Sequence, residues 1–339
     1  MRFDNKREII DIIEYYMHND TEPLFAAARE AREPYYGKRI FLRGLVEVTN
    51  YCKQNCFYCG IRYGNENIRR YRLDKEQILE CVRTGFELGF HSFVLQGGED
   101  SHFTDDIMVD IISCVKEKFP DCAVTLSMGE KSRESYQKYY DAGAARYLLR
   151  HETANTEHYQ KLHPTQLSFE NRKKCLRDLK EVGFQTGAGF MVGSPYQTIE
   201  NLAEDLLFLR ELKPHMVGIG PFIPHKETPF REFPSGNVEL TLIMVALCRV
   251  MLPDAMLPAT TALGSVDDNG RERAINAGAN VIMPNLSPYE FRADYALYDN
   301  KLSTGSEAAE AIAAIKKRIT DIGYIPDLST GHHYTHNVR

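Results

Sequence analysis

The chain has no hydrophobic run long enough to cross a membrane. A spanning helix needs about 18 or more consecutive apolar residues, and no stretch of the 339 residues meets this requirement. The first residues also lack the apolar core of a signal peptide. We therefore expect a cytoplasmic protein that does not associate with membranes.

An excess of positive charge is also missing. The formal net charge is −6 at pH 7. Proteins that bind nucleic acid usually present a strong positive field to the phosphates, so a polynucleotide partner is disfavoured. The hydrophobic fraction of 43% is ordinary for a globular protein with a full core, and the length allows one large α/β barrel or two ordinary domains.

Most of the eight cysteines show no pairing pattern. In the cytoplasm they should remain thiols, because disulfides are rare there. Isolated cysteines of this kind usually behave as small buried hydrophobic residues. We expect this role for Cys81, Cys114, Cys122, Cys175 and Cys248.

Three other cysteines do form a pattern. Cys52, Cys56 and Cys59 are spaced Cys-x3-Cys-x2-Cys, and Tyr58 directly precedes the last of them. Three thiolates on one short loop can bind three irons of a 4Fe-4S cluster and leave the fourth iron open to a substrate or cofactor. A structural zinc site would need a fourth ligand, usually from a second Cys-x2-Cys or histidine pair, and no such pair follows nearby. The spacing predicts one 4Fe-4S cluster of the radical S-adenosylmethionine (SAM) type.

Short β-rich segments alternate with helical patterns from Arg39 onward. Capping signals mark several helix starts, such as Asp74 followed by Gln77 and Thr198 followed by Asn201. The predicted strands are Ile40–Val48, Ser92–Gln96, Ala123–Ser127, Arg146–His151, Thr186–Val192, Met216–Phe222, Leu257–Ala262 and Asn280–Pro284. The predicted helices are near 74–88, 104–118, 132–142, 169–183, 198–212, 238–252, 270–277 and 306–323.

Strict alternation of strands and helices implies a parallel sheet. Eight such units fit a complete (β/α)8 TIM barrel, with an open doubly wound sheet as the alternative. Residues 39–325 would form this barrel. Residues 1–38 would form a helical extension that packs across the bottom of the barrel or beside it. Residues 326–339 would form a loosely held polar tail, whose histidines are solvated rather than bound to metal. These histidines are His332, His333 and His336.

The active site of such a barrel lies at the C-terminal ends of its strands. Gly97 and Gly98 follow the second predicted strand, where glycine lets a ligand approach the backbone closely. Bound SAM needs a carboxylate for its ammonium group and an arginine for its carboxylate. Glu152 at the end of the fourth predicted strand suits the first role, and Arg172 early in the next helix suits the second.

Several longer motifs resemble the HydE family of FeFe-hydrogenase maturases. The wider clan includes biotin synthase and methylornithine synthase. The resemblance covers roughly residues 35–300. The motifs that carry it are Arg146–Asn155, Ser168–Arg172, Thr186–Gly189, Met216–His225, Pro258–Thr261 and Val281–Asn285.

The resemblance implies that the three motif cysteines bind the catalytic cluster. One-electron reduction would then cleave SAM to methionine and a 5′-deoxyadenosyl radical. The residues expected at the cofactor are Tyr58, Gln96, Gly97, Gly98, Ser127, Glu152 and Arg172. The residues expected at a small anionic or zwitterionic substrate are Arg150, Thr260 and Thr261. In the HydE family this substrate is an organometallic iron–cysteine species. The resemblance also implies a ferredoxin- or flavodoxin-type reductant and other hydrogenase maturases as partners.

Cysteine positions separate this chain from some relatives. Biotin synthase needs a second cluster deep in the barrel, whereas Cys122 lies at the opposite end and the remaining cysteines lie on predicted helices. Many HydE chains carry a second, C-terminal cluster, but residues 301–323 contain no cysteine. A methylornithine-synthase-like mutase remains the enzymatic alternative, because it needs only one cluster and a small polar cavity. A non-catalytic iron–sulfur scaffold is the alternative from a different class.

Overall fold

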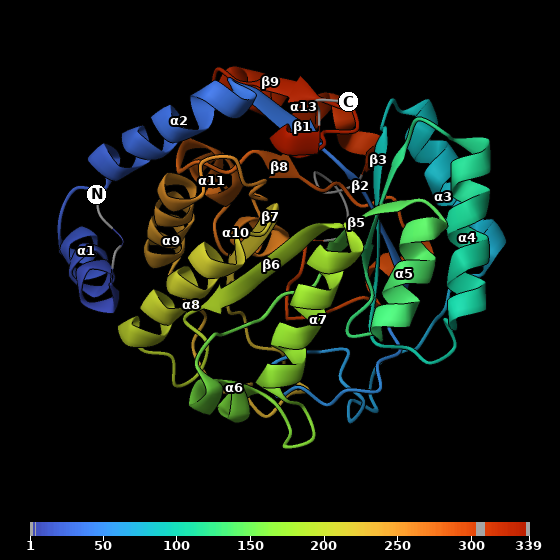
Figure 1. Ribbon diagram of the computed structural model, residues 1–339, viewed down its shortest axis with the longest axis horizontal. Helices are drawn as coiled ribbons and strands as arrows, with labels where there is room; N and C mark the ends of the chain where they lie inside the picture. Colours follow the sequence, from blue (N-terminus) through green and yellow to red (C-terminus); the bar gives the residue numbers. More distant parts are fainter. Residues whose placement is uncertain (1–2, 4, 303–308, 337–339) are drawn as a thin grey trace.

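The computed structural model describes residues 3, 5–302 and 309–336. Strands and helices alternate along most of this length (Figure 1). The strands are β1 (Arg39–Leu42), β2 (Gly44–Thr49), β3 (Ser92–Gly97), β4 (Ala123–Ser127), β5 (Ala144–Leu148), β6 (Gln185–Val192), β7 (Met216–Pro221), β8 (Val281–Ile282) and β9 (Ile325–Asp327).

The helices account for most of the outer surface of the fold. The longer ones are α1 (Lys6–His18), α2 (Glu22–Tyr36), α3 (Lys75–Glu87), α4 (Asp105–Lys118), α5 (Arg133–Asp141), α7 (Phe169–Val182), α8 (Ile199–Leu212), α9 (Val238–Met251) and α13 (Ile312–Asp321). The shorter ones are α6 (Thr156–Leu162), α10 (Thr261–Val266), α11 (Gly270–Asn276), α12 (Tyr289–Arg292), η2 (Ala309–Ala311) and η3 (Tyr334–His336). None of these described helices is long and apolar enough to cross a membrane.

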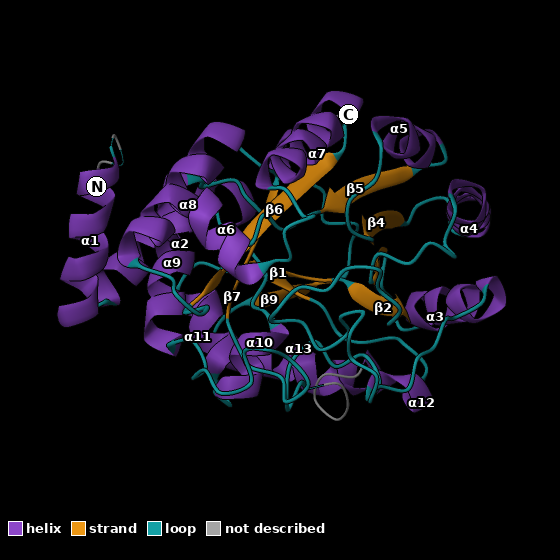
Figure 2. Cartoon of the chain, turned by 90° about the horizontal axis from the view of Figure 1, so that it is seen from below, coloured by secondary structure: helices purple, strands orange, loops and turns teal. Residues whose placement is uncertain are grey.

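Six parallel strands form one sheet in the order β2-β3-β4-β5-β6-β7, so neighbours in sequence are neighbours in space. A helix follows each of β2 to β6 before the next strand begins, and these helices lie outside the curved sheet (Figure 2). This arrangement confirms the alternation of strands and helices predicted from the sequence. Apolar side chains of the strands and of the surrounding helices together form the main hydrophobic core.

Isolated parallel bridges continue the pairing beyond β7. They join Met216 with Met256, Pro258 with Val281, and Leu45 with Asn285. Together they connect β7 back to β2 through the segment 256–285, which gives the (β/α)-barrel class predicted from the sequence. The consequence is that the C-terminal ends of strands far apart in sequence face one common region.

Two predicted strands do not occur as single strands in the structure. Ile40–Val48 is not one strand, because β1 pairs with β8 and β9 whereas β2 pairs with β3. The partner changes because β9, from near the C-terminus, lies beside β1. The predicted strand Leu257–Ala262 is also wrong, since only isolated bridges form there and Thr260 is the N-cap of α10. The predicted last helix is described only from residue 309 onward, so residues 306–308 lie outside the described part.

The N-terminal extension lies beside the barrel. Helix α1 packs against α8 and α9, and α2 packs against α9 and α11 (Figure 1). The buried side chains at these contacts include Ile9, Ile13, Leu24 and Ala28. Burial of these apolar side chains stabilises the extension on the outer helices.

The described part of the tail is not loosely held, contrary to the prediction. Arg146 Nη2 donates to Thr330 O at 2.5 Å, and Arg43 Nη2 donates to Gly331 O at 3.2 Å. Both arginines are buried within the barrel. The tail therefore covers the end of the barrel opposite the motif cysteines and accepts hydrogen bonds from two buried guanidinium groups.

The tail histidines are also not simply solvated. His333 is buried, and its ring lies with those of His215 and His336 in a group whose possible ligand atoms are within 4.8 Å of one another. However, His215 Nδ1 accepts a hydrogen bond from Thr186 N at 3.0 Å. In the neutral ring the proton is then on Nε2, so His215 offers no free lone pair to a metal in this arrangement. Residues 337–339 of the predicted tail lie outside the described residues.

Four of the five scattered cysteines are buried as predicted, and Cys114 is not. All are free thiols, and Cys114 is half-buried. The other four are buried: Cys81, Cys122, Cys175 and Cys248.

Replacing Arg146 should release the tail from the barrel. Arg146→Ala removes charge-assisted hydrogen bonds to Thr330 O and Ser92 Oγ. We expect the free energy of unfolding to fall by about 3 kcal/mol, measured by chemical denaturation, and the tail to become sensitive to protease. The control Arg133→Ala removes only ion pairs of a half-exposed side chain and should cost less than about 1 kcal/mol. Equal losses in the two variants would contradict this role of Arg146.

Candidate functional site

The motif cysteines lie on the loop that follows β2, which we call the cluster loop (residues 50–65). This loop packs closely against the end of β3. A Cβ atom on Gly98 would lie 2.2 Å from Tyr51 O and 2.7 Å from Cys52 Cβ. Only glycine allows this approach, so Gly98 is needed for the cluster loop to lie over the strand ends.

Cys52, Cys56 and Cys59 line one cavity of about 290 Å³ at the C-terminal ends of the strands. Among the residues that line it, no fourth cysteine and no histidine occurs. Burial, with a smaller contribution from the neighbouring Cys52, raises the pKa of the Cys59 thiol to about 12. Thiols in such surroundings become thiolates when a metal binds them. The donor set therefore fits a 4Fe-4S cluster held by three cysteines, with one iron left open.

The structure brings almost all of the predicted site residues to this cavity. Thr261 is the exception: it begins α10, and its hydroxyl accepts a hydrogen bond from Arg271 Nη2 at 3.0 Å. The predicted residues that line the cavity, besides the cysteines, are Tyr58, Gln96, Gly97, Gly98, Ser127, Arg150, Glu152, Arg172 and Thr260.

The chain leaves β5 earlier than predicted, at Leu148 rather than His151. Beyond it, Glu152 has a φ of 66°, a left-handed conformation that is uncommon for residues other than glycine. Arg150 Nη2 lies 3.2 Å from Glu152 Oε2, yet neither atom forms a hydrogen bond within the described chain, and Arg150 Nε also forms none. Buried polar atoms are normally satisfied, so a ligand with both a cationic and an anionic group fits this pair.

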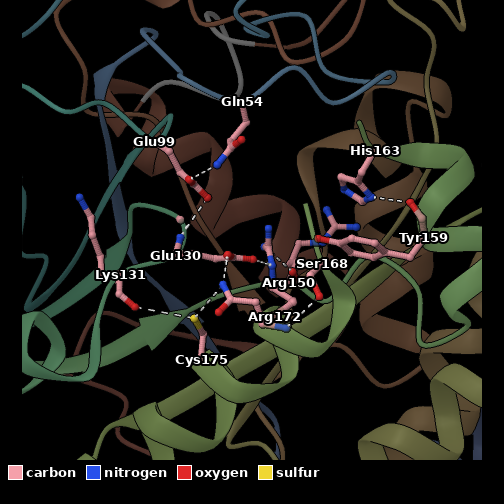
Figure 3. A network of polar contacts seen from close by, with 12 residues as sticks. Gln54, Glu99, Glu130, Lys131, Arg150, Tyr159, His163, Ser168, Arg172 and Cys175 are labelled. Atoms are coloured by element: carbon pink, nitrogen blue, oxygen red, sulfur yellow. Dashed lines mark hydrogen bonds and ion pairs between the residues drawn. The ribbon is translucent and has the colours of Figure 1, made fainter. Parts of the chain in front are cut away.

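A second ion pair fixes Arg172. Its Nε donates to Glu130 Oε1 at 2.5 Å, and its Nη1 donates to Arg150 O at 3.0 Å (Figure 3). Asn171 Nδ2 donates to the other oxygen of Glu130 at 2.6 Å. The Nη2 group of Arg172 remains for a ligand carboxylate. Sequence analysis did not assign a role to Glu130, although its position after the third predicted strand placed it near the site.

Glu99 connects the cluster loop to the neighbouring strand ends. Its carboxylate accepts from Gln54 Nε2 at 2.7 Å and from Glu130 N at 3.0 Å (Figure 3). The close approach requires Gly129, which has a φ of 72° and where a Cβ would lie 2.0 Å from Glu99 Cγ. Glu99 is therefore engaged in positioning the loop.

The ring of Tyr58 is held by a histidine that sequence analysis missed. His163 Nδ1 lies 2.9 Å from Tyr159 O, so this nitrogen carries the proton. His163 Nε2 then accepts from the Tyr58 hydroxyl at 3.1 Å. Burial, with a smaller contribution from Arg172, lowers the pKa of His163 to about 3, so the ring stays neutral. Tyr58 and His163 are far apart in the sequence, and only the folded position of α6 brings them into contact. A motif search in the sequence therefore could not relate them.

Two further tyrosines were missed. Tyr295 and Tyr298 line the cavity from the irregular segment after β8. Gln96 Nε2 donates to the Tyr295 hydroxyl at 3.3 Å. The segment lacks strand or helix periodicity, so its sequence contains no signal that it lines the cavity.

Comparison with known proteins agrees with this geometry. The family model for the radical SAM superfamily matches residues 46–209. The [FeFe] hydrogenase maturase subunit HydE of Thermotoga maritima is 47% identical over 310 residues, which cover 91% of this chain and 88% of the relative. The 3-methylornithine synthase of Methanosarcina barkeri is 32% identical over 90% of this chain and 85% of the relative.

Solved structures give the same picture of the fold. The crystal structure of methylornithine synthase (PylB) has a TM-score of 0.82 and 27% identity, and the match covers 95% of this chain and 94% of that one. The hydrogenase maturase HydG of Carboxydothermus hydrogenoformans has a TM-score of 0.78 at 22% identity, covering 96% of this chain and 80% of that one. The second similarity concerns the fold alone.

Loss of any motif cysteine should abolish cluster binding. The triple variant of Cys52, Cys56 and Cys59 to Ala should bind almost no iron after anaerobic reconstitution, whereas the native chain should bind about four iron atoms. The control Cys114→Ala changes a thiol on α4 that does not line the cavity and should keep the native iron content. Equal iron loss in the control would refute the assignment of the three ligands.

Loss of either charged SAM contact should weaken SAM binding without removing the cluster. Glu152→Gln and Arg172→Ala each remove a charge-assisted contact worth about 1.5–3 kcal/mol, or roughly tenfold to a hundredfold in Kd. Equilibrium binding of SAM would measure this, with the cluster absorbance as a check of integrity. Arg177→Ala, on the same helix but outside the cavity, should leave Kd unchanged. Native affinity in both site variants would rule out their assigned roles.

Proposed function

The chain belongs to the radical SAM superfamily and, within it, to the family of the [FeFe] hydrogenase maturase HydE, and we propose that it acts in assembly of the diiron site of FeFe-hydrogenase. The observation that carries the proposal is one cavity that combines three half-buried thiols with the incompletely hydrogen-bonded pair Arg150 and Glu152. The identity to HydE over nearly the whole chain supports the same reaction class.

Different side chains of the protein would bind the different charged groups of SAM. When bound, the cluster supplies the electron that splits SAM into methionine and a 5′-deoxyadenosyl radical. Glu152 would accept hydrogen bonds from the SAM ammonium group, and Arg172 Nη2 would donate to its carboxylate. Gly97 and Gly98 would let the cofactor approach the backbone closely. Tyr295 would help to exclude water from the radical.

The substrate would lie on the far side of SAM from the cluster. Arg150 and Thr260 line that part of the proposed site, and Thr260 Oγ1 has no hydrogen-bond partner within the described chain. These donors suit a small anionic or zwitterionic substrate, such as the organometallic iron–cysteine species that the HydE resemblance implies. Thr261 would act indirectly, because its hydroxyl is already engaged by Arg271.

The proposed chemistry also implies partners and a location. Reduction of a low-potential cluster requires a one-electron donor, for which we infer a ferredoxin or flavodoxin. Delivery of the product implies contact with other hydrogenase maturases. A cytoplasmic location suits these steps, because the free thiols of the chain stay reduced there.

A methylornithine-synthase-like activity is the second candidate. It is favoured by the 32% identity to the Methanosarcina barkeri enzyme and by the TM-score of 0.82 to methylornithine synthase. Reconstituted, reduced protein should be tested in two assays with SAM. Maturation of apo-hydrogenase in the presence of the other maturases would support the HydE role. Conversion of lysine to 3-methylornithine would support the second candidate. Failure to form any 5′-deoxyadenosine would leave only the iron–sulfur scaffold.

Arg150 should separate SAM cleavage from substrate processing. Arg150→Met removes a charged donor that we assign to the substrate, so hydrogenase maturation should fall roughly tenfold to a hundredfold. Formation of 5′-deoxyadenosine without substrate should stay within a few fold of native, since the proposed SAM contacts remain. Arg177→Met provides the control for loss of an arginine on the neighbouring helix. Unchanged maturation in Arg150→Met would exclude Arg150 as a substrate-binding residue.

A further inference from the structure

Arg70 holds both ends of the cluster loop through its guanidinium group. Nη1 donates to Ile61 O at 2.9 Å, and Nη2 donates to Arg62 O at 2.7 Å. The four backbone carbonyls that accept from this one side chain are those of Asn50, Ile61, Arg62 and Asn65.

These contacts lie on both sides of the cysteine motif. Asn50 is two residues before Cys52, and Ile61 is two residues after Cys59. A planar guanidinium with several fixed donors suits such a bridge better than an ammonium group. The side chain of Arg70 therefore ties the entry of the motif to its exit.

The hydrogen-bond partners of Arg70 differ from those of the neighbouring arginines. Arg69 forms an ion pair with Asp294, and Arg72 forms one with Asp100 at 2.7 Å. Within residues 5–302 and 309–336, the guanidinium of Arg70 donates hydrogen bonds only to neutral backbone carbonyls. The hydrogen bonds to Asn50 O and Ile61 O place the guanidinium beside the loop that carries Cys52 and Cys59. Burial lowers the pKa of Arg70, and the charges of Cys52 and Cys59 oppose this effect.

We propose that Arg70 is a positioning residue that fixes the cluster loop and raises the reduction potential of the bound cluster. The reduction potential of an iron–sulfur cluster depends on nearby charge, hydrogen bonding and solvent exposure. A fixed cation that no carboxylate neutralises favours the state with one more electron, most strongly where water is excluded. The inference rests on the proposed function, because it requires a redox-active cluster on the three cysteines.

Three variants of the full chain separate charge from hydrogen bonding. Arg70→Lys keeps the charge but not the four-carbonyl geometry, Arg70→Gln keeps part of the hydrogen bonding without charge, and Arg70→Met keeps neither. The matched control is Arg69→Met, which changes the adjacent, carboxylate-paired arginine. Reconstituted proteins would be compared by redox titration monitored by electron paramagnetic resonance. Amide hydrogen exchange of residues 50–65 would be measured on the cluster-free proteins.

We expect the midpoint potential to become more negative in Arg70→Gln and Arg70→Met, to stay closest to native in Arg70→Lys, and to be unchanged in Arg69→Met. Hydrogen exchange of the cluster loop should be faster in Arg70→Met and Arg70→Lys than in native protein and the control. A native potential in Arg70→Gln, or native exchange in Arg70→Met, would overturn the proposal. If native protein itself gave no 4Fe-4S signal after reconstitution, the proposed function would fail instead, and the exchange data would still report on the loop.

Discussion

The site depends first on the backbone pairings that join β7 back to β2. Without them, the strand ends that carry the cysteines, the SAM contacts and the substrate contacts would lie along an open edge. The pairings at Met256, Pro258 and Asn285 are isolated single-residue bridges. In the described chain no regular strand forms at the seventh predicted strand, Leu257–Ala262. The consequence is that the segment 256–261 can end in a helix N-terminus at the cavity, which places Thr260 opposite the cluster loop.

Within this frame, most charged groups of the site are fixed before any ligand binds. Glu130 holds Arg172, and Glu99 holds the cluster loop, so neither arginine nor loop must be ordered by the cofactor. Pre-organisation of this kind lowers the entropic cost of binding. The side chains of Arg150 and Glu152 are the contrast, because they lie 3.2 Å apart while Arg150 Nε, Arg150 Nη2 and Glu152 Oε2 form no hydrogen bond within the described chain. A bound ligand would therefore gain the most binding free energy from hydrogen bonds to this pair.

Local signals allowed much of the fold to be predicted from the sequence, and long-range contacts account for the errors. The capping boxes at Asp74 and Thr198 are present, because they involve residues three apart. The cysteine motif is equally local. By contrast, β9 pairs with β1 although nearly 300 residues separate them in the sequence. This pairing explains why the first predicted strand is divided in two, and it holds the start of the tail against the barrel. His163 was missed for the same reason, since only the folded position of α6 relates it to Tyr58.

The shared barrel explains why the fold does not by itself select a product. A hydrogenase maturase and methylornithine synthase both resemble this chain along most of its length. The cluster loop and the strand ends that would hold SAM therefore do not distinguish the two reactions. Differences in reaction must then arise where the cavity extends past the proposed SAM contacts. The cavity residues not assigned to SAM include Met191, Phe222, Tyr298 and Arg150. Arg150 is the charged donor among them, which favours a substrate with an anionic group at this position.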